Sequence, residues 1–225
     1  MIPISDELPT RRVPLLTWGL IAVNVLVFLW ELLLGPDLDR FLMMWGAVPA
    51  FITNPARYPW APLTLLTSMF LHGGWMHLIG NMLYLWIFGD NVEDALGRLG
   101  YLLFYLAAGI VAGLAQVMVA PSSTIPGVGA SGAIAGVLAV YLVLYPSAPV
   151  RVLVPGFYMM RIARLPALLV LGFWFVIQLF NGALSLGVVT LATGGIAWFA
   201  HIGGFLAGLV VGLGARAFGA RRAYW

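Results

Sequence analysis

The chain contains no cysteine and no lysine, and few of its side chains carry a charge. Without cysteine it has no disulfide, no thiolate metal site and no cysteine nucleophile. All eleven basic residues are arginine, and charged residues make up 8% of the sequence, against about 25% in a soluble domain. Hydrophobic residues make up 62% of the chain, and the mean hydropathy is +1.01. This composition excludes an ordinary soluble domain and predicts a polytopic membrane protein.

Six apolar segments, separated by polar or Gly/Pro-rich connections, are predicted to be membrane helices. They are residues 15–34, 75–90, 99–120, 131–145, 167–186 and 196–218. The predicted fold class is all-α, with six transmembrane helices around a water-accessible cavity inside the membrane. The predicted units are a cytoplasmic tail (1–14), one membrane domain (15–218) and a second cytoplasmic tail (219–225). The long connection over residues 35–74 is expected to lie at the outer interface, with short helices.

The arginines are distributed unequally between the two sides of this topology. Nine lie on the side of the termini: Arg11, Arg12, Arg98, Arg151, Arg161, Arg164, Arg216, Arg221 and Arg222. Arg40 and Arg57 lie on the other side. This bias predicts that both termini are cytoplasmic and that the loop before Ser131 faces outward. Topology thus accounts for the net charge of +3, and no nucleic-acid partner is expected.

A serine lies at the start of the fourth apolar segment, in the sequence Gly129-Ala130-Ser131-Gly132. The fifteen residues of this segment span about 22 Å as a helix, whereas a bilayer core is about 30 Å thick. If the helix reaches one membrane face, Ser131 lies below the other. Irregular backbone at that depth is tolerated only inside protein or beside a wet cavity. Ser131 is therefore a candidate nucleophile in a cavity that opens to the outside.

The three histidines lie in or beside predicted spans, where a polar side chain is costly. His77 and Asn81 are four residues apart and share one helix face, and His72 lies five residues before His77. Two donors on one face, close to a serine, can stabilise the negative oxygen of a tetrahedral acyl intermediate. The alternative is a polar patch that bonds a neighbouring helix.

Small residues recur every four positions in the fourth and sixth spans. These stripes are Gly132 and Gly136, and Gly204, Gly208 and Gly212. Packed together, they would place His201 opposite Ser131, so that the imidazole can take the serine proton and later protonate the leaving amine. Alternatively, the stripes only pack helices and His201 is an interhelical donor. No Asp or Glu follows Asp94, so a Ser–His dyad is expected rather than a triad.

Metal and aspartyl chemistry fit the sequence poorly. Three histidines without an in-membrane carboxylate or a His-Glu-x-x-His pairing make a poor zinc site, so no metal and no cofactor are expected. An aspartyl protease of the membrane interior needs two facing carboxylates within spans, which this sequence does not offer.

Four motifs, in this order, resemble the rhomboid family of intramembrane serine proteases. They are His72-x-x-x-x-His77-x-x-x-Asn81, Glu93-x-x-x-Gly97, Gly129-x-Ser131-Gly132 and Ala200-His201-x-x-Gly204-x-x-x-Gly208. The resemblance covers residues 15–216. It implies that Ser131 is the nucleophile and His201 the base, and that the Ser131 N–H, His77 and Asn81 form the oxyanion site. The motif residues that would shape the site are His72, Gly129, Gly132, Gly204 and Gly208.

The resemblance also implies a substrate. This would be a transmembrane helix of another protein, cut near its outer end after unwinding, with small residues favoured at the cut. The first loop would lie in the outer leaflet, and the fifth span with the loop before His201 would form a lateral gate. Besides such substrates, the expected partner is membrane lipid, and the expected location is a bacterial inner membrane. The sequence predicts no particular oligomeric state.

Two places depart from the family pattern. Leu63 and Thr64 stand where many members have a Trp-Arg pair, although Trp60 is close by. Ala135 stands where many members have an aromatic ring stacked on the catalytic histidine, so another group is expected to hold that ring. The serine and the histidine are both kept, and Ala130 rather than proline precedes the serine, so activity is expected.

Two other functions are compatible with the same apolar segments and histidines. A non-catalytic membrane chaperone would bind single-span clients with this fold. A transporter would relay protons through His77 and His201, but the chain lacks a repeat relating its halves and an in-span carboxylate.

Overall fold

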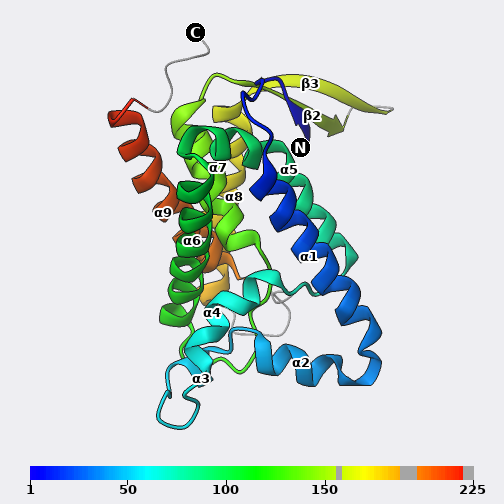
Figure 1. The fold of residues 1–225 in the computed structure, drawn as a ribbon, viewed down its shortest axis with the longest axis vertical. Helices are drawn as coiled ribbons and strands as arrows, with labels where there is room; N and C mark the ends of the chain where they lie inside the picture. Colours follow the sequence, from blue (N-terminus) through cyan, green and yellow to red (C-terminus); the bar gives the residue numbers. More distant parts are fainter. Residues whose placement is uncertain (156–158, 188–196, 220–225) are drawn as a thin grey trace.

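The long helices run side by side along one axis of the molecule (Figure 1). The computed structural model of the chain describes residues 1–155, 159–187 and 197–219. The long helices in this part are α1 (Leu15–Leu33), α5 (Trp75–Leu96), α6 (Arg98–Val119), α7 (Ser131–Leu144), α8 (Ala167–Gly187) and α9 (Trp198–Ala217). The N-terminal segment and the end of α9 lie at the same end of the bundle (Figure 1). The predicted helical fold class is confirmed.

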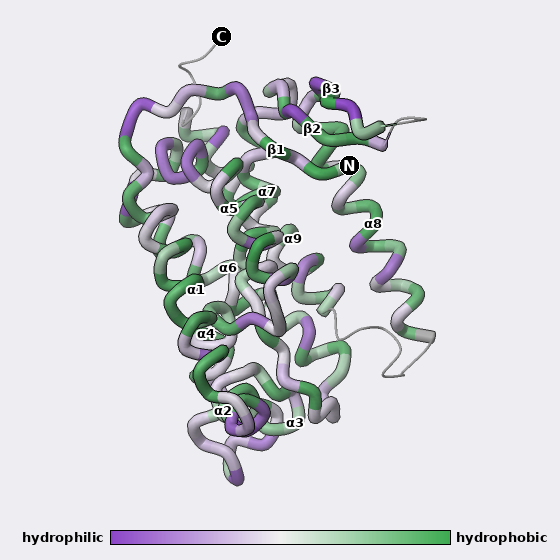
Figure 2. Tube along the Cα trace, turned by 90° about the vertical axis from the view of Figure 1, so that its right-hand side faces the viewer, coloured by the Kyte–Doolittle hydropathy of each residue, from purple (hydrophilic) through white to green (hydrophobic). Residues whose placement is uncertain are grey.

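Four of the described helices, α1, α6, α8 and α9, are long and apolar enough to cross a membrane. α7 is apolar but shorter, with 14 residues, and α5 carries Asp90, Glu93 and Asp94 near its end. Hydrophobic residues follow the helices, and hydrophilic ones gather at the two ends of the bundle (Figure 2). The chain is therefore an integral membrane protein, while the count of six crossings stays a prediction.

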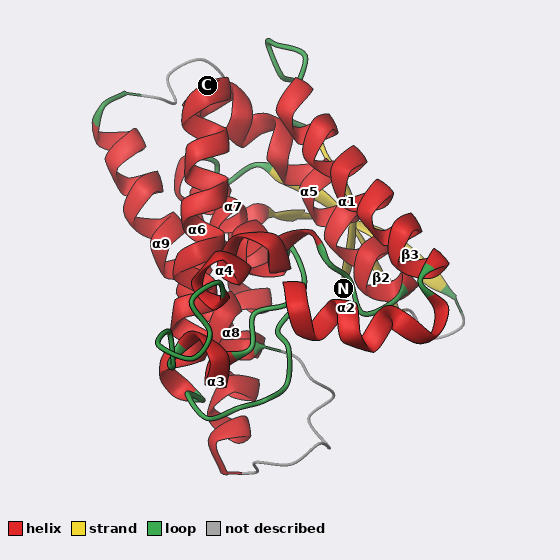
Figure 3. Ribbon diagram, turned by 60° about the horizontal axis from the view of Figure 1, so that its bottom comes forward, coloured by secondary structure: helices red, strands yellow, loops and turns green. Residues whose placement is uncertain are grey.

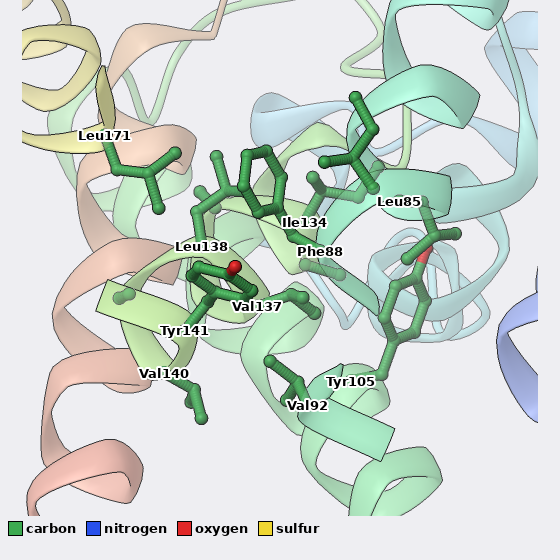
Figure 4. Packing of buried hydrophobic residues seen from close by; sticks show 14 of the residues in the cluster. Leu85, Phe88, Val92, Tyr105, Ile134, Val137, Leu138, Val140, Tyr141 and Leu171 are labelled. Carbon is green, nitrogen blue, oxygen red and sulfur yellow. The ribbon is translucent and has the colours of Figure 1, made fainter. Parts of the chain in front are cut away.

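α7 is the central helix because it is apolar on every side. Apart from Ser131, Leu142 and Val143, all its residues are buried. A helix without a polar face has to be surrounded by other apolar elements, and here α5, α6, α8 and α9 pack around it. The packed side chains in Figure 4 include Leu85, Phe88 and Val92 of α5, Tyr105 of α6, Leu171 of α8, and Ile134, Val137, Leu138, Val140 and Tyr141 of α7.

The glycine stripes of α7 and α9 face each other, which is the packing predicted from their spacing. A Cβ atom at Gly204 would overlap the carbonyl group of Gly132, and one at Gly208 would overlap the carbonyl group of Gly136. In lipid there is little hydrophobic gain from helix association, so stability comes from close backbone approach of this kind. The two helices are thereby held with their first turns side by side.

The first connection folds into short helices, as expected. They are η1 (Gly35–Asp37), α2 (Leu38–Trp45), α3 (Pro49–Ile52), η2 (Ala61–Leu63), α4 (Thr64–Thr67) and η3 (Ser68–Phe70). Figure 3 shows α2, α3 and α4 with their loops covering one end of the bundle. At the departures from the family pattern, Leu63 is exposed and the Thr64 hydroxyl donates to the Ala61 carbonyl at 2.6 Å. The Trp60 ring contacts Phe51 and Tyr58 instead.

α7 begins well inside the bundle. Its 14 residues span about 21 Å, whereas the 22 residues of the neighbouring α6 span about 33 Å. The irregular backbone before Ser131 is bonded to the first connection: Ala47 and Gly127 exchange two N–H···O bonds of 2.9 Å, and the Gly129 N–H donates to the Ser68 carbonyl at 2.9 Å. Protein groups thus satisfy the backbone at this depth, as a lipid environment requires.

A three-stranded antiparallel sheet in the described part of the chain was not predicted. β1 (Ile2–Asp6) pairs with β2 (Pro149–Pro155), which pairs with β3 (Met160–Pro166). These strands lie where the sequence indicated a polar tail and a plain loop. Ion pairs connect its strands, because Arg151 of β2 and Arg164 of β3 both donate to Glu7, which follows β1. It also contacts the core, because the Tyr141 hydroxyl donates to Asp6 at 2.6 Å.

Two further expectations were wrong. α5 continues to Leu96 instead of ending at residue 90. Its last turns carry Glu93, which caps the start of α1 by accepting from the backbone N–H groups of Leu16 and Thr17 at 3.1 and 2.8 Å. Glu31 is the one charged residue of the first predicted span, and its place near the end of that span predicts that its carboxylate can reach the interface. Instead it is buried and accepts from the His72 N–H at 3.2 Å. The chain folds back over this carboxylate before α5 begins.

Some predictions fall outside the described residues. They are the predicted gate loop from residue 188 to 195, the start of the sixth span at residue 196, and the C-terminal tail from residue 220 onward.

The glycine contact between α7 and α9 predicts a large difference between two substitutions on one helix. Gly204→Ala forces a methyl group against the α7 backbone and is expected to destabilise the protein by ~1–3 kcal/mol. Gly214→Ala is the matched control, because a Cβ there meets no atom within 4 Å and alanine favours a helix. Thermal midpoints in detergent should fall for Gly204→Ala and hold or rise for Gly214→Ala. Equal midpoints would contradict the packing.

The Asp6–Tyr141 contact predicts a pH dependence. Burial raises the pKa of the Asp6 carboxyl to about 6, although the bond from Tyr141 opposes this rise. The folded protein therefore holds this proton more tightly than the unfolded chain, so the stabilisation is complete below about pH 4 and is lost as the pH rises through about 6. Asp6→Asn keeps an acceptor without the charge. The thermal midpoint of Asp6→Asn minus that of the wild type should increase by a few degrees when the pH is raised from about 4 to 7.5. A constant difference would contradict the prediction.

Candidate active site

The first turns of α7 and α9 bring a hydroxyl and an imidazole together. The Ser131 Oγ atom lies 2.8 Å from the His201 Nε2 atom, and both side chains are half-buried. Ser131 is the first residue of α7, where backbone N–H groups have no partner inside the helix. A hydroxyl that contacts an imidazole in this way is a possible nucleophile, since the ring can take its proton.

Two residues from α5 lie against the glycine that precedes this pair. A Cβ atom at Gly129 would lie 2.6 Å from His77 Cε1, 2.7 Å from His77 Nε2 and 3.6 Å from Asn81 Nδ2. Gly129 also has a φ of +124°, which side chains rarely allow. Glycine is therefore required here twice, for its backbone conformation and for the space that the two α5 side chains occupy.

Both α5 side chains present a donor toward this place. The Gly73 N–H donates to His77 Nδ1 at 3.4 Å, so the neutral ring carries its hydrogen on Nε2, the atom that faces Gly129. Asn81 Nδ2 is buried and has no hydrogen-bond partner in the described part of the protein. A buried donor left without a partner costs about 1–3 kcal/mol, and a negatively charged oxygen placed between the two groups would recover it.

These residues line one cavity of about 560 Å³. Ser131, His77, Asn81 and His201 contribute its polar surface together with Tyr84. Its apolar surface comes from Met76, Ile134, Leu138, Trp174 and neighbouring small residues. The cavity is therefore suited to hold an apolar peptide segment next to a small set of hydrogen-bonding groups.

His72 lies beside this cavity rather than among its lining residues. Its ring is 5.2 Å from the His77 ring, edge to face, and its backbone N–H is held by the buried Glu31 carboxylate. His72 therefore contacts the site through the His77 ring.

Three residues that the sequence analysis did not single out surround His201. Gln178 Oε1 lies 2.8 Å from His201 Nδ1, and the Trp174 and Trp198 rings lie 5.9 and 6.2 Å from the imidazole. These groups contact the imidazole, whereas Ala135 offers it no aromatic ring. Gln178 is the one amide in the apolar run from 167 to 180, a signal that could have identified it.

The other predicted site residues act through packing. Gly132 and Gly136 of α7 lie against Gly204 and Gly208 of α9, as described above. Among the residues that the structure describes, no three His, Asp or Glu side chains form a group able to hold a metal ion.

Comparisons with known proteins identify the family of this chain. The family model described as the rhomboid domain matches residues 59–218. The presenilin-associated rhomboid-like protein, mitochondrial, of Homo sapiens is 37% identical over 124 residues, which are 54% of this chain and 30% of that protein. Rhomboid-like protein 11, chloroplastic, of Arabidopsis thaliana is 31% identical over 138 residues, 60% of this chain and 44% of that protein.

Rhomboid protein 1, mitochondrial, of Saccharomyces cerevisiae is 29% identical over 205 residues, 88% of this chain and 52% of that protein. The chain thus spans about a third to a half of the length of these relatives. Their names place them in mitochondria and chloroplasts, so they give no support to the expected bacterial inner membrane. The rhomboid match covers more than half of the chain, including every residue of the candidate site, and on this evidence the chain belongs to the rhomboid family.

Proposed function

We propose that this chain is a serine endopeptidase that cuts transmembrane segments of other membrane proteins near their outer ends. The observation that carries the proposal is the 2.8 Å contact between Ser131 Oγ and His201 Nε2 at the wall of a cavity of about 560 Å³. Membership of the rhomboid family supports the same reaction class.

The proposed reaction follows from the placement of these groups. His201 Nε2 takes the hydroxyl proton as Ser131 Oγ attacks the peptide carbonyl carbon and forms the C–O bond. The imidazolium then gives this proton to the amide nitrogen as the C–N bond breaks, which releases the amine fragment. Water, with His201 as base, hydrolyses the acyl ester and restores the serine.

The oxyanion formed in the first step has donors close by. His77 Nε2–H and Asn81 Nδ2–H face the Gly129 backbone, and the Ser131 N–H lies at the start of α7. Donors fixed before the reaction stabilise the developing charge without reorganising, which is why they accelerate acyl transfer.

The substrate is proposed from the position and lining of the cavity. Ser131 begins a helix that is eight residues shorter than the neighbouring α6, so we infer that a peptide that reaches it has to enter the membrane region. The apolar wall formed by Met76, Ile134 and Leu138 suits the side chains of a membrane segment. The segment must be unwound, because a helix surrounds each carbonyl carbon with its own turns. The family resemblance adds small residues at the cut and a lateral gate formed by the fifth span.

The orientation is proposed from the arginines. Arg98, Arg151, Arg164 and Arg216 lie at the sheet end of the bundle, whereas Arg57 follows α3 at the opposite end. Positively charged segments are retained on the cytoplasmic side of bacterial membranes and on the corresponding side of related ones. Both termini are proposed to lie on that side, with the cavity opening to the other.

Cleavage of a single-span substrate in lipid vesicles tests the function. The purified wild-type protein should cut near the outer end of the segment, and Ser131→Ala and His201→Ala should each abolish cleavage. Asn81→Ala should lower kcat by ~10–1,000-fold, since it removes one oxyanion donor. Ser185→Ala is the matched control, because that hydroxyl donates to the Gly182 carbonyl of its own helix at 2.7 Å and does not line the cavity. Wild-type protein that binds the substrate without cutting it would instead favour a chaperone.

Labelling by a fluorophosphonate tests the nucleophile without a peptide substrate. The reagent should modify the purified protein at Ser131, which mass spectrometry can locate. Ser131→Ala should remove the label, and His201→Gln should slow labelling at least tenfold because the hydroxyl loses its base. Labelling that is equally fast in His201→Gln would contradict the proposed pair.

A further inference from the structure

The amide of Gln178 lies on the far side of the His201 ring from the serine. Its Oε1 atom is 2.8 Å from His201 Nδ1, while His201 Nε2 is 2.8 Å from Ser131 Oγ. Gln178 is 5% exposed and comes from α8, whereas the histidine comes from α9 and the serine from α7. Three helices thus meet in one line of hydrogen bonds.

The direction of this line is fixed by a second contact of the amide. Gln178 Nε2 donates to the Trp174 carbonyl at 3.3 Å. A carbonyl oxygen can only accept, so the amide nitrogen has to face Trp174, and the amide oxygen is left for the histidine. An amide oxygen can only accept too, so His201 Nδ1 carries the hydrogen and donates it. In the neutral ring, Nε2 is then unprotonated and faces the Ser131 hydroxyl.

We propose, on the basis of the function proposed above, that Gln178 is a positioning residue that holds His201 in the tautomer able to accept the proton of Ser131. The residue touches neither the substrate nor the reacting atoms. It acts by fixing the ring orientation and by accepting the Nδ1–H while the ring is positively charged. A carboxylate often does this work in soluble serine hydrolases. Here a neutral amide does it without placing a permanent charge at membrane depth.

Two tryptophan rings also contact the His201 imidazole. Trp174 lies one turn before Gln178 on α8, and its ring is 5.9 Å from the imidazole at 38°. Trp198 lies one turn before His201 on α9, with its ring nearly perpendicular to the imidazole at 6.2 Å. The rings restrict tilt, and the amide restricts rotation about the ring axis. Because Gln178 and Trp174 both belong to α8, a displacement of α8 away from α9 would release the histidine.

Two substitutions separate positioning from plain helix packing. Gln178→Met keeps the length and loses the acceptor, so kcat should fall ~10–100-fold with KM changed less than about threefold. Gln178→Glu keeps the acceptor and adds a negative charge, which favours the imidazolium. The lower pH midpoint of kcat/KM should therefore move upward by at least about one unit. The titratable side chains that share the cavity with His201 are His77 and Tyr84 of α5, and they are unchanged in both variants.

The tautomer can also be observed without a reaction. The chain has three histidines, so the imidazole ¹⁵N spectrum of the labelled protein in detergent is simple, and His201→Gln assigns the relevant pair of signals. Wild-type His201 should show a protonated Nδ1 and an unprotonated Nε2. Gln178→Met should show a mixture of both tautomers, and Ser185→Ala should match the wild type.

The outcomes are distinguishable. Wild-type protein without cleavage activity would overturn the proposed function and this inference with it. An active wild type, with Gln178→Met unchanged in kcat and in the ¹⁵N spectrum, would overturn the inference alone. If Gln178→Met does not fold, Gln178→Glu decides by its pH midpoint, because a role confined to packing would leave that midpoint unchanged.

Discussion

The candidate site depends first on the close approach of α7 to α9. Helices that meet through ordinary side chains have axes about 8–10 Å apart, and a serine and a histidine on their first turns would then be separated by those side chains. Glycines remove this spacing, because the α9 backbone at Gly204 lies directly against the Gly132 carbonyl. The short Ser131 side chain can therefore reach the imidazole of His201. In lipid, where apolar burial contributes little to helix association, the same contact is also a main source of stability.

No charged side chain of the described residues lines the cavity. Glu93 caps α1, Glu31 holds the backbone ahead of α5, and Glu7 and Asp6 join the sheet to the bundle. Around the cavity the hydrogen-bonding groups of the described chain are a hydroxyl, imidazoles, a phenol and an amide, all neutral in their ordinary forms near neutral pH. A charge in a poorly solvated site would have to be compensated continuously. With neutral donors and acceptors, a charge is present in the site only while a reaction produces one.

Short-range patterns were enough to predict the centre of the molecule. The short apolar segment after Ser131 indicated a buried helix start, and the four-residue glycine spacing indicated which helices touch. The sheet could not be found in this way, because β1 pairs with a strand almost 150 positions later and both strands contain proline. Gln178 was visible as an isolated amide, but its use depends on the rotation of α8 against α9, which no local pattern sets. Glu31 was misjudged because the chain that covers it lies forty residues away.

The loop before Ser131 links the first connection to the candidate site. Its backbone is held by the first connection through Ala47 and Ser68, and this fixes Gly129. Gly129 in turn makes room for the His77 ring and the Asn81 amide, so the helices of the first connection determine where the α5 donors lie relative to the serine. A loop in lipid could not hold such a shape unaided, since its N–H and C=O groups would lack partners. The first connection therefore supplies the bonds that allow an irregular backbone, and with it the candidate site, to lie within the helix bundle.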